Sequence, residues 1–148
     1  MIPIQNTKTL LMVPPELKDN GDFTTNSYVD TLGWDHLRVI FITGFTDITI
    51  GSTAEGTAPL IEECDTTDGT YTDITSAALA DSIAATEDNS LFCIDVDLHG
   101  CKRYVEVQKP HSGDGDTGAY LCVIGILSRG ETAPNTAAEA GFTEWIKA

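Results

Sequence analysis

Positive charge is scarce in this sequence of 148 residues. Eight Lys and Arg residues stand against 23 Asp and Glu residues, which gives a formal net charge of -15 at pH 7. Because so acidic a surface repels phosphate backbones and anionic membranes, direct binding to nucleic acid or to a membrane is disfavoured. Acidity favours solubility, cation uptake and contact with basic partner surfaces, or is simply the charge of a soluble surface.

Long apolar runs are also missing. The longest apolar stretches are far shorter than the ~20 residues that a membrane-spanning helix needs. The beginning of the chain, MIPIQNTKTLLMVPP, has neither the basic segment nor the continuous apolar segment of a signal peptide. We therefore expect the protein to be made in a reducing cytosol.

The four cysteines form no recognisable metal-binding or disulfide pattern, because their spacing matches neither a CxxC pair nor a zinc ribbon. Cys93 and Cys122 lie inside apolar runs and are interpreted as small core residues. Cys64 and Cys101 lie nearer to strand ends. The sequence leaves open whether a disulfide forms once the protein is outside the cell.

Catalytic and nucleotide-binding signatures are missing as well. The sequence has no GxSxG motif and no Gly-rich phosphate loop, and no histidine stands beside a Ser or Cys in a known nucleophile signature. The stretch DGDTG at 114–118 resembles the start of a calcium loop. Counting from Asp114, however, the sixth and twelfth positions hold Ala119 and Gly125 instead of the Gly and Glu that an EF-hand requires. The sequence thus predicts no enzyme, no cofactor and no metal centre.

The sequence does contain a series of short apolar runs separated by clusters of Gly, Asp, Thr, Asn and Ser, the pattern of an all-β protein. The predicted extended segments are 7–13, which Pro14 and Pro15 stop, and then 23–33, 36–45, 58–64, a short strand ending at 74, 91–98, 102–108 and 119–128. About eight strands predict a single antiparallel β-sandwich of jelly-roll-like type over residues 1–130, with an extended N-terminal arm, and a barrel as the alternative. The Ala-rich stretch 76–90 is predicted as a connection, and residues 131–148 as a short extended or helical C-terminal tail.

Individual strands differ in their expected burial. Residues 36–45 and 119–128 are apolar on both faces and should lie inside a sheet, the second of them centrally. Residues 91–98 alternate, with Ile94, Val96 and Leu98 pointing to one side. Residues 102–108 alternate in the same way, and the short link between these two segments predicts a hairpin.

The stretch CIDVDLHGC, residues 93–101, places Asp95, Asp97 and His99 at every second position. Two carboxylates and an imidazole on one face could bind a metal or carry acid–base chemistry. A half-buried strand needs such a polar face in any case, and a site would need ligands that converge from a second element. We interpret the three residues as a solvated face that the neighbouring strand extends.

The tail places Phe142, Trp145 and Ile146 at helical i, i+3, i+4 spacing after a linker that contains Pro134. Two interpretations stay open. The three apolar side chains fold back onto the chain's own sandwich, or they anchor the protein to a neighbouring subunit.

Four segments in order resemble a family of small proteins encoded near the major capsid gene in tailed phages and prophages. The matching residues are Val29–Trp34, Glu63–Ile74, Asp97–Tyr104 and Ala119–Arg129. The resemblance covers most of residues 25–130 and leaves out the tail. Its motifs are structural turns, not catalytic signatures.

The resemblance implies a non-enzymatic virion protein that decorates (cements) the outer surface of the phage head, is made in the host cytoplasm and has the major capsid protein as its partner. A symmetric homo-oligomer, with a trimer favoured over a dimer, would match the local axes of a capsid. The alternative is a carbohydrate-binding β-sandwich module of a phage fibre or tail, which would use Trp34, Tyr71 and Tyr104. A metal-dependent hydrolase that acts through Asp95 is a third hypothesis.

Overall fold

The computed structural model describes residues 6–26, 28–130, 134 and 136–144, and these contain eleven strands. In chain order the strands are β1 (Thr7–Lys18), β2 (Gly21–Asp22), β3 (Val29–Asp30), β4 (His36–Thr46), β5 (Ile50–Ser52), β6 (Leu60–Cys64), β7 (Thr72–Ala78), β8 (Leu91–Asp97), β9 (Tyr104–Val107), β10 (Pro110–Ser112) and β11 (Ala119–Ser128).

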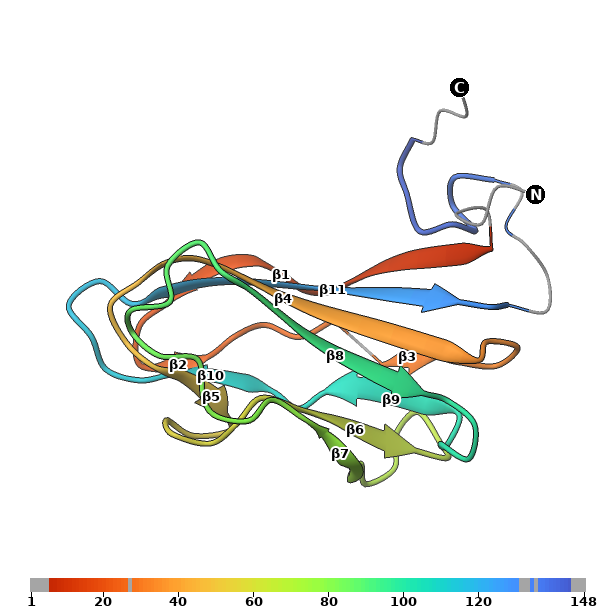
Figure 1. Cartoon of the computed structure of the whole chain (residues 1–148), viewed down its shortest axis with the longest axis horizontal. Helices are drawn as coiled ribbons and strands as arrows, with labels where there is room; N and C mark the ends of the chain where they lie inside the picture. Colours follow the sequence, from red (N-terminus) through yellow and green to blue (C-terminus); the bar gives the residue numbers. More distant parts are fainter. Residues whose placement is uncertain (1–5, 27, 131–133, 135, 145–148) are drawn as a thin grey trace.

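The strands form two layers, which Figure 1 shows one above the other. One layer is a four-stranded antiparallel sheet in the order β1-β11-β4-β8. The other layer consists of a three-stranded sheet, β2-β10-β5, and a four-stranded sheet, β3-β9-β6-β7. The prediction of an all-β antiparallel sandwich is confirmed.

The chain crosses repeatedly between the two layers. It passes from β1 to β2 and β3 in the opposite layer, returns to β4, and crosses again to β5, β6 and β7 (Figure 1). It then runs through β8 in the first layer, β9 and β10 in the second layer, and β11 in the first layer. Three times, two consecutive strands follow a single path along the second layer: β2 and β3, β5 and β6, and β9 and β10. For this reason eleven strands occur where about eight were predicted. This crossing favours the jelly-roll form, which stays a prediction.

The core lies between the layers and follows from alternation along the strands. In β4 and β11 every second side chain points inward, and most of these are fully or almost fully buried, whereas the outward side chains are half-buried or exposed. The burial on both faces that the apolar pattern predicted is therefore found on one face only. The buried residues of these two strands include Leu37, Val39, Phe41, Leu121, Val123 and Leu127. The prediction that 119–128 is central is confirmed, because β11 lies between β1 and β4.

Strand β1 corrects the prediction that Pro14 and Pro15 stop the first strand. The strand continues to Lys18, and its register against β11 shifts between Val13 and Glu16. A proline cannot donate a ladder hydrogen bond, but it is tolerated at a bulge on an edge strand, and β1 is the edge of its sheet.

The predicted hairpin of residues 91–98 and 102–108 is wrong. β8 pairs with β4 in one layer, whereas β9 pairs with β3 and β6 in the other layer. The link between them, including Gly100 at a φ of 88°, therefore carries the chain from one sheet to the other. Alternation identifies a strand but says nothing about its partner.

Smaller expectations also changed. Strand β7 extends to Ala78, so the first residues of the predicted connection belong to a strand. In the segment 23–33, Phe23 and Val29 are buried, whereas Leu32 is 68% exposed. The cysteine interpretation is wrong for Cys93, which is exposed, and for Cys122, which is only half-buried.

The described part of the tail forms one hydrogen-bonded turn that packs on the sandwich. Thr136 and Glu139 cap the start of the turn reciprocally. The turn ends at Gly141, which has a φ of 86°, and the amides of Gly141 and Phe142 donate back to Ala138 and Ala137 in the pattern of a Schellman motif.

Candidate functional site

Asp95, the first residue of the predicted polar face, is held by Arg38 of the neighbouring strand. The Arg38 guanidinium donates two hydrogen bonds to the two Asp95 carboxylate oxygens, at 2.8 and 2.9 Å. His36 Nε2 lies 3.4 Å from the same carboxylate. The hydrogen bonds from Arg38 hold the pKa of Asp95 below its usual value, so the group is a poor proton donor near neutral pH.

Asp97 and His99 form a second, local pair. Asp97 Oδ1 accepts a hydrogen bond from the His99 backbone amide and lies 2.7 Å from His99 Nδ1. The hydrogen bond to Asp97 raises the pKa of His99, and the His99 backbone amide lowers the pKa of Asp97. Both side chains are more than two thirds exposed, so they act as a solvated turn at the end of β8.

These residues do not converge with the polar face of β9. Because β9 lies in the other layer, Tyr104, Glu106 and Gln108 are on a different surface from Asp95, which corrects the expected shared surface. Within the described part of the chain, no group of three or more His, Cys, Asp or Glu residues is placed to hold a metal ion.

The loop 113–118, which contains the calcium-like stretch DGDTG, is tied to the rest of the domain. Asp47 accepts hydrogen bonds from the backbone amides of Thr117 and Gly118 at 2.7 and 2.9 Å, and Asp19 accepts one from Gly115 at 2.8 Å. These carboxylates come from other loops, and they hold the backbone of this one in place.

The aromatic residues proposed for glycan binding divide into two places. Tyr28 and Tyr104 make an edge-to-face contact at 4.9 Å between ring centroids, with the Arg103 guanidinium 5.1 Å above the Tyr104 ring. Burial, with the nearby Glu106 charge and these two tyrosines, raises the pKa of Tyr71 to about 12, so Tyr71 belongs to this cluster. Trp34 does not, because its ring lies against Gly130 at the end of β11.

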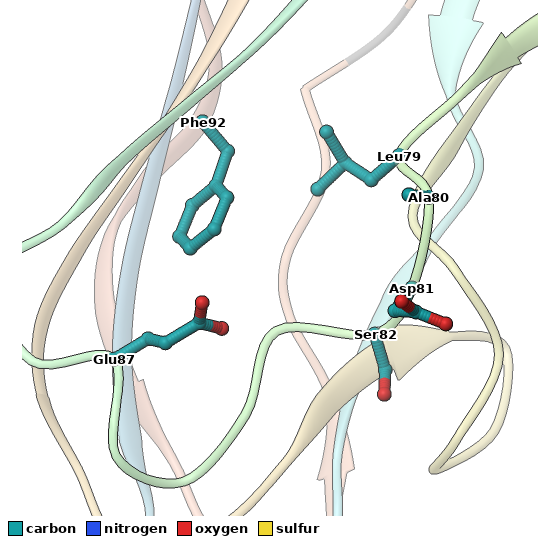
Figure 2. Close-up of a pocket in the computed structure, with 6 residues that line it drawn as sticks. All are labelled: Leu79, Ala80, Asp81, Ser82, Glu87 and Phe92. Carbon is teal, nitrogen blue, oxygen red and sulfur yellow. The ribbon is translucent and has the colours of Figure 1, made fainter.

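A small pocket of about 210 Å³ lies between the two layers at the side of β8. Figure 2 shows Phe92 and Leu79 facing each other across it, with the Glu87 carboxylate and Ser82 below. Its volume is under the ~300 Å³ of typical ligand sites. The Glu87 carboxylate also accepts a hydrogen bond from the Ala84 amide, so it is already used to hold a turn.

The tail residues proposed for interaction are only partly within the described structure. Phe142 is 43% exposed, whereas Trp145 and Ile146 lie outside the described residues. The helical spacing does not extend back to Phe142, because the hydrogen-bonded turn ends at Gly141. Ala140, which the sequence gave no reason to single out, is buried, and its carbonyl accepts the Thr9 amide at 2.8 Å.

No family model matches this chain, and neither the curated proteins nor the solved structures searched contain a significant match. In the described residues, no helix is long and apolar enough to cross a membrane.

Proposed function

We propose that this protein is a structural, non-enzymatic virion component that binds the outer surface of a phage head and stabilises the shell. The family resemblance of residues 25–130 suggests this role, and the fold is suited to it. A two-layer sandwich whose loops are pinned by their own hydrogen bonds is stiff, and a stiff body can link neighbouring capsid subunits. Its charge of -15 would be repelled by packaged DNA and so favours the outside of the head.

The observation that carries the proposal is that both terminal segments meet at one end of the sandwich (Figure 1). Asn6 donates a hydrogen bond from its side-chain amide to the Gly130 carbonyl at 2.8 Å, and the Thr9 backbone amide donates one to the Ala140 carbonyl. The exposed Phe142 ring follows directly. One end of an acidic protein thus presents an apolar side chain beside both terminal segments, and we assign capsid attachment to this end.

The first test is the gene neighbourhood, which should contain a major capsid gene. The second test measures binding of this protein to empty shells assembled from that capsid protein. Phe142→Ala should weaken binding about tenfold, the equivalent of about 1.4 kcal/mol of lost apolar burial. Phe45→Ala is the matched control, because Phe45 is exposed to a similar degree (47%) and lies near the far end of β4.

Binding that is lost equally with both Phe variants would argue against this attachment end. Absence of binding to the shell at any protein concentration would reject the decoration role.

The carbohydrate-binding module stays a second candidate because of the cluster of Tyr28, Tyr71 and Tyr104. Exposed aromatic rings are a common platform for sugar rings, and the Tyr28 ring, in contact with Tyr104, is 36% exposed. A glycan array distinguishes the two functions. Specific binding that Tyr104→Ala abolishes would favour the module, and a blank array would favour the structural role.

A further inference from the structure

The outer face of the sheet β1-β11-β4-β8 is apolar across all four strands in its middle. Paired residues on neighbouring antiparallel strands share a face, so the register defines rows across the sheet. One row consists of Leu11, Ile124, Ile40 and Cys93. The next consists of Cys122, Ile42 and Leu91. We call these two rows the apolar face.

The apolar face is open to solvent in the single chain. Leu91 is 70% exposed and Leu11 46% exposed, and the side chains at the centre of the face are only half-buried. Solvated antiparallel sheets normally alternate apolar and polar residues, but the outward positions in the middle of β4 and β11 carry isoleucine and cysteine. Because the largest exposed apolar patch of a monomer is often functional, we infer that something covers the face.

The charges that border the apolar face indicate which kind of partner can bind to it. The adjoining row carries Ile126 with the paired Arg38 and Asp95, whose charges cancel. The apolar rows themselves carry no charged residue. A basic partner surface would bind to the acidic parts of the molecule. The apolar face and its bordering row carry no net charge that such a partner could bind.

We propose that the apolar face binds the same face of a second copy of this chain. Two copies that each carry a charge of -15 repel one another when their acidic surfaces meet. Contact through the apolar face brings no unpaired carboxylates together and removes the exposed Ile and Leu side chains from water. The proposal stands apart from the capsid role, because it needs no other protein.

The size of the face is sufficient for a modest dimer. The two apolar rows span about 14 Å along four strands at ~4.8 Å spacing, or roughly 260 Å² per copy. With the adjoining row on each side, about seven residues at ~3.4 Å, the contact covers roughly 450 Å² per copy, or about 900 Å² in total. This total lies just under the ~1,000 Å² of stable specific interfaces, so a weak dimer is expected.

The shape of the contact favours two copies over three. One flat face that meets itself is related by a twofold axis, whereas a threefold ring needs two different patches on each copy. A dimer is therefore proposed in place of the trimer that the sequence favoured. A groove of about 400 Å³ beside the rows, where Gly44 lacks a side chain next to Tyr120, gives room for a side chain of the opposite copy.

The test is sedimentation of the full chain from about 1 to about 100 μM, the range in which a contact of this size should associate. The wild type should change from monomer to dimer across that range. Leu91→Lys should raise the dissociation constant at least tenfold. Leu32→Lys is the matched control, because Leu32 is 68% exposed but lies on the loop after β3, outside the apolar face. Ile124→Lys, at the centre of the face, should prevent association while the circular dichroism spectrum stays unchanged.

A second readout identifies which face is covered. Cys93 is exposed on the apolar face, so its rate of modification by a thiol reagent should fall as protein concentration rises. A monomer at every concentration with a constant Cys93 rate would overturn the proposal. So would association that the two Leu variants weaken equally, or a monomer whose shell binding Ile124→Lys abolishes, since the face would then belong to the capsid.

Discussion

Asp95 and Arg38 show how this protein uses carboxylates that resemble catalytic groups in the sequence. The Arg38 hydrogen bonds lower the pKa of Asp95 in the folded state. A group whose folded pKa is depressed contributes stability above its unfolded pKa and loses it as the pH falls through the folded value. Because both side chains are about half exposed, the contribution is under about 1 kcal/mol.

Arg38→Gln should therefore raise the pKa of the Asp95 carboxyl toward its ordinary value of about 4. The change is measured by NMR titration of the Asp95 side chain, with Asp97 as the internal reference in the same spectrum. The stability difference between variant and wild type should shrink in acid, below the Asp95 pKa. An unchanged Asp95 titration in the variant would show that Arg38 does not set this pKa.

Gly141 is a second residue that determines the local structure, because it lacks a Cβ atom. It has a φ of 86°, and an added Cβ would overlap the Thr9 carbonyl oxygen. Gly141→Ala should cost about 2 to 3 kcal/mol or release the tail, since it combines backbone strain with a steric overlap. Urea denaturation and limited proteolysis of the tail measure these outcomes.

Gly56→Ala is the control for that substitution. Gly56 has a similar φ of 82°, but nothing lies within 4 Å of its added Cβ. It should cost only the strain, about 1 kcal/mol. If the two variants are equally stable and the tail is equally protected, the tail does not dock on β1.

Among the elements, the loop 113–118 depends on a neighbouring loop for its conformation. Asp47→Ala removes both acceptors of the Thr117 and Gly118 amides and should cost about 1 to 3 kcal/mol. Hydrogen exchange at these two amides should accelerate at least tenfold. Asp116→Ala removes the same charge from the loop itself and should leave both amides protected, whereas equal acceleration in the two variants would assign the effect to charge alone.

The strands were predictable from the sequence wherever the pattern was a property of the strand itself. Two-faced apolar segments identified β4 and β11, and clean alternation identified β8 and its inward residues. Pairing was not predictable in this way, because the partner of a strand depends on the packing of the whole chain. β8 and β9 therefore lie in different layers despite a short link. The prolines of β1 were misleading because a bulge at a sheet edge tolerates them.

The candidate site was predictable only in part. Alternation correctly predicted that Asp95 and Asp97 lie on the solvent-exposed face of a sheet. The structure shows that their partners are Arg38 and His99. The docking of Ala140 carries no sequence signal, because an alanine becomes informative only when another strand lies against it. The apolar face was present in the sequence as the second face of β4 and β11, but a pattern cannot say whether the same chain or a second one covers it.

At the scale of the whole molecule, one end gathers the described parts of both terminal segments, including the exposed Phe142, and one sheet face is apolar. The two apolar rows carry no acidic residue. This division of the surface is what a protein would need if it pairs through one face and attaches to a shell at one end. The proposed dimer would then gain avidity, since two weak attachments on a local twofold axis of a capsid act together.

The most direct test of the decoration role is a cryo-electron microscopy reconstruction of virions from the phage whose capsid gene neighbours the gene for this chain. The account predicts density for the sandwich on the outer surface of the head, with the end that carries Ala140 and Phe142 toward the shell. Density for this chain in the tail or inside the head, or virions that lack the chain altogether, would contradict it.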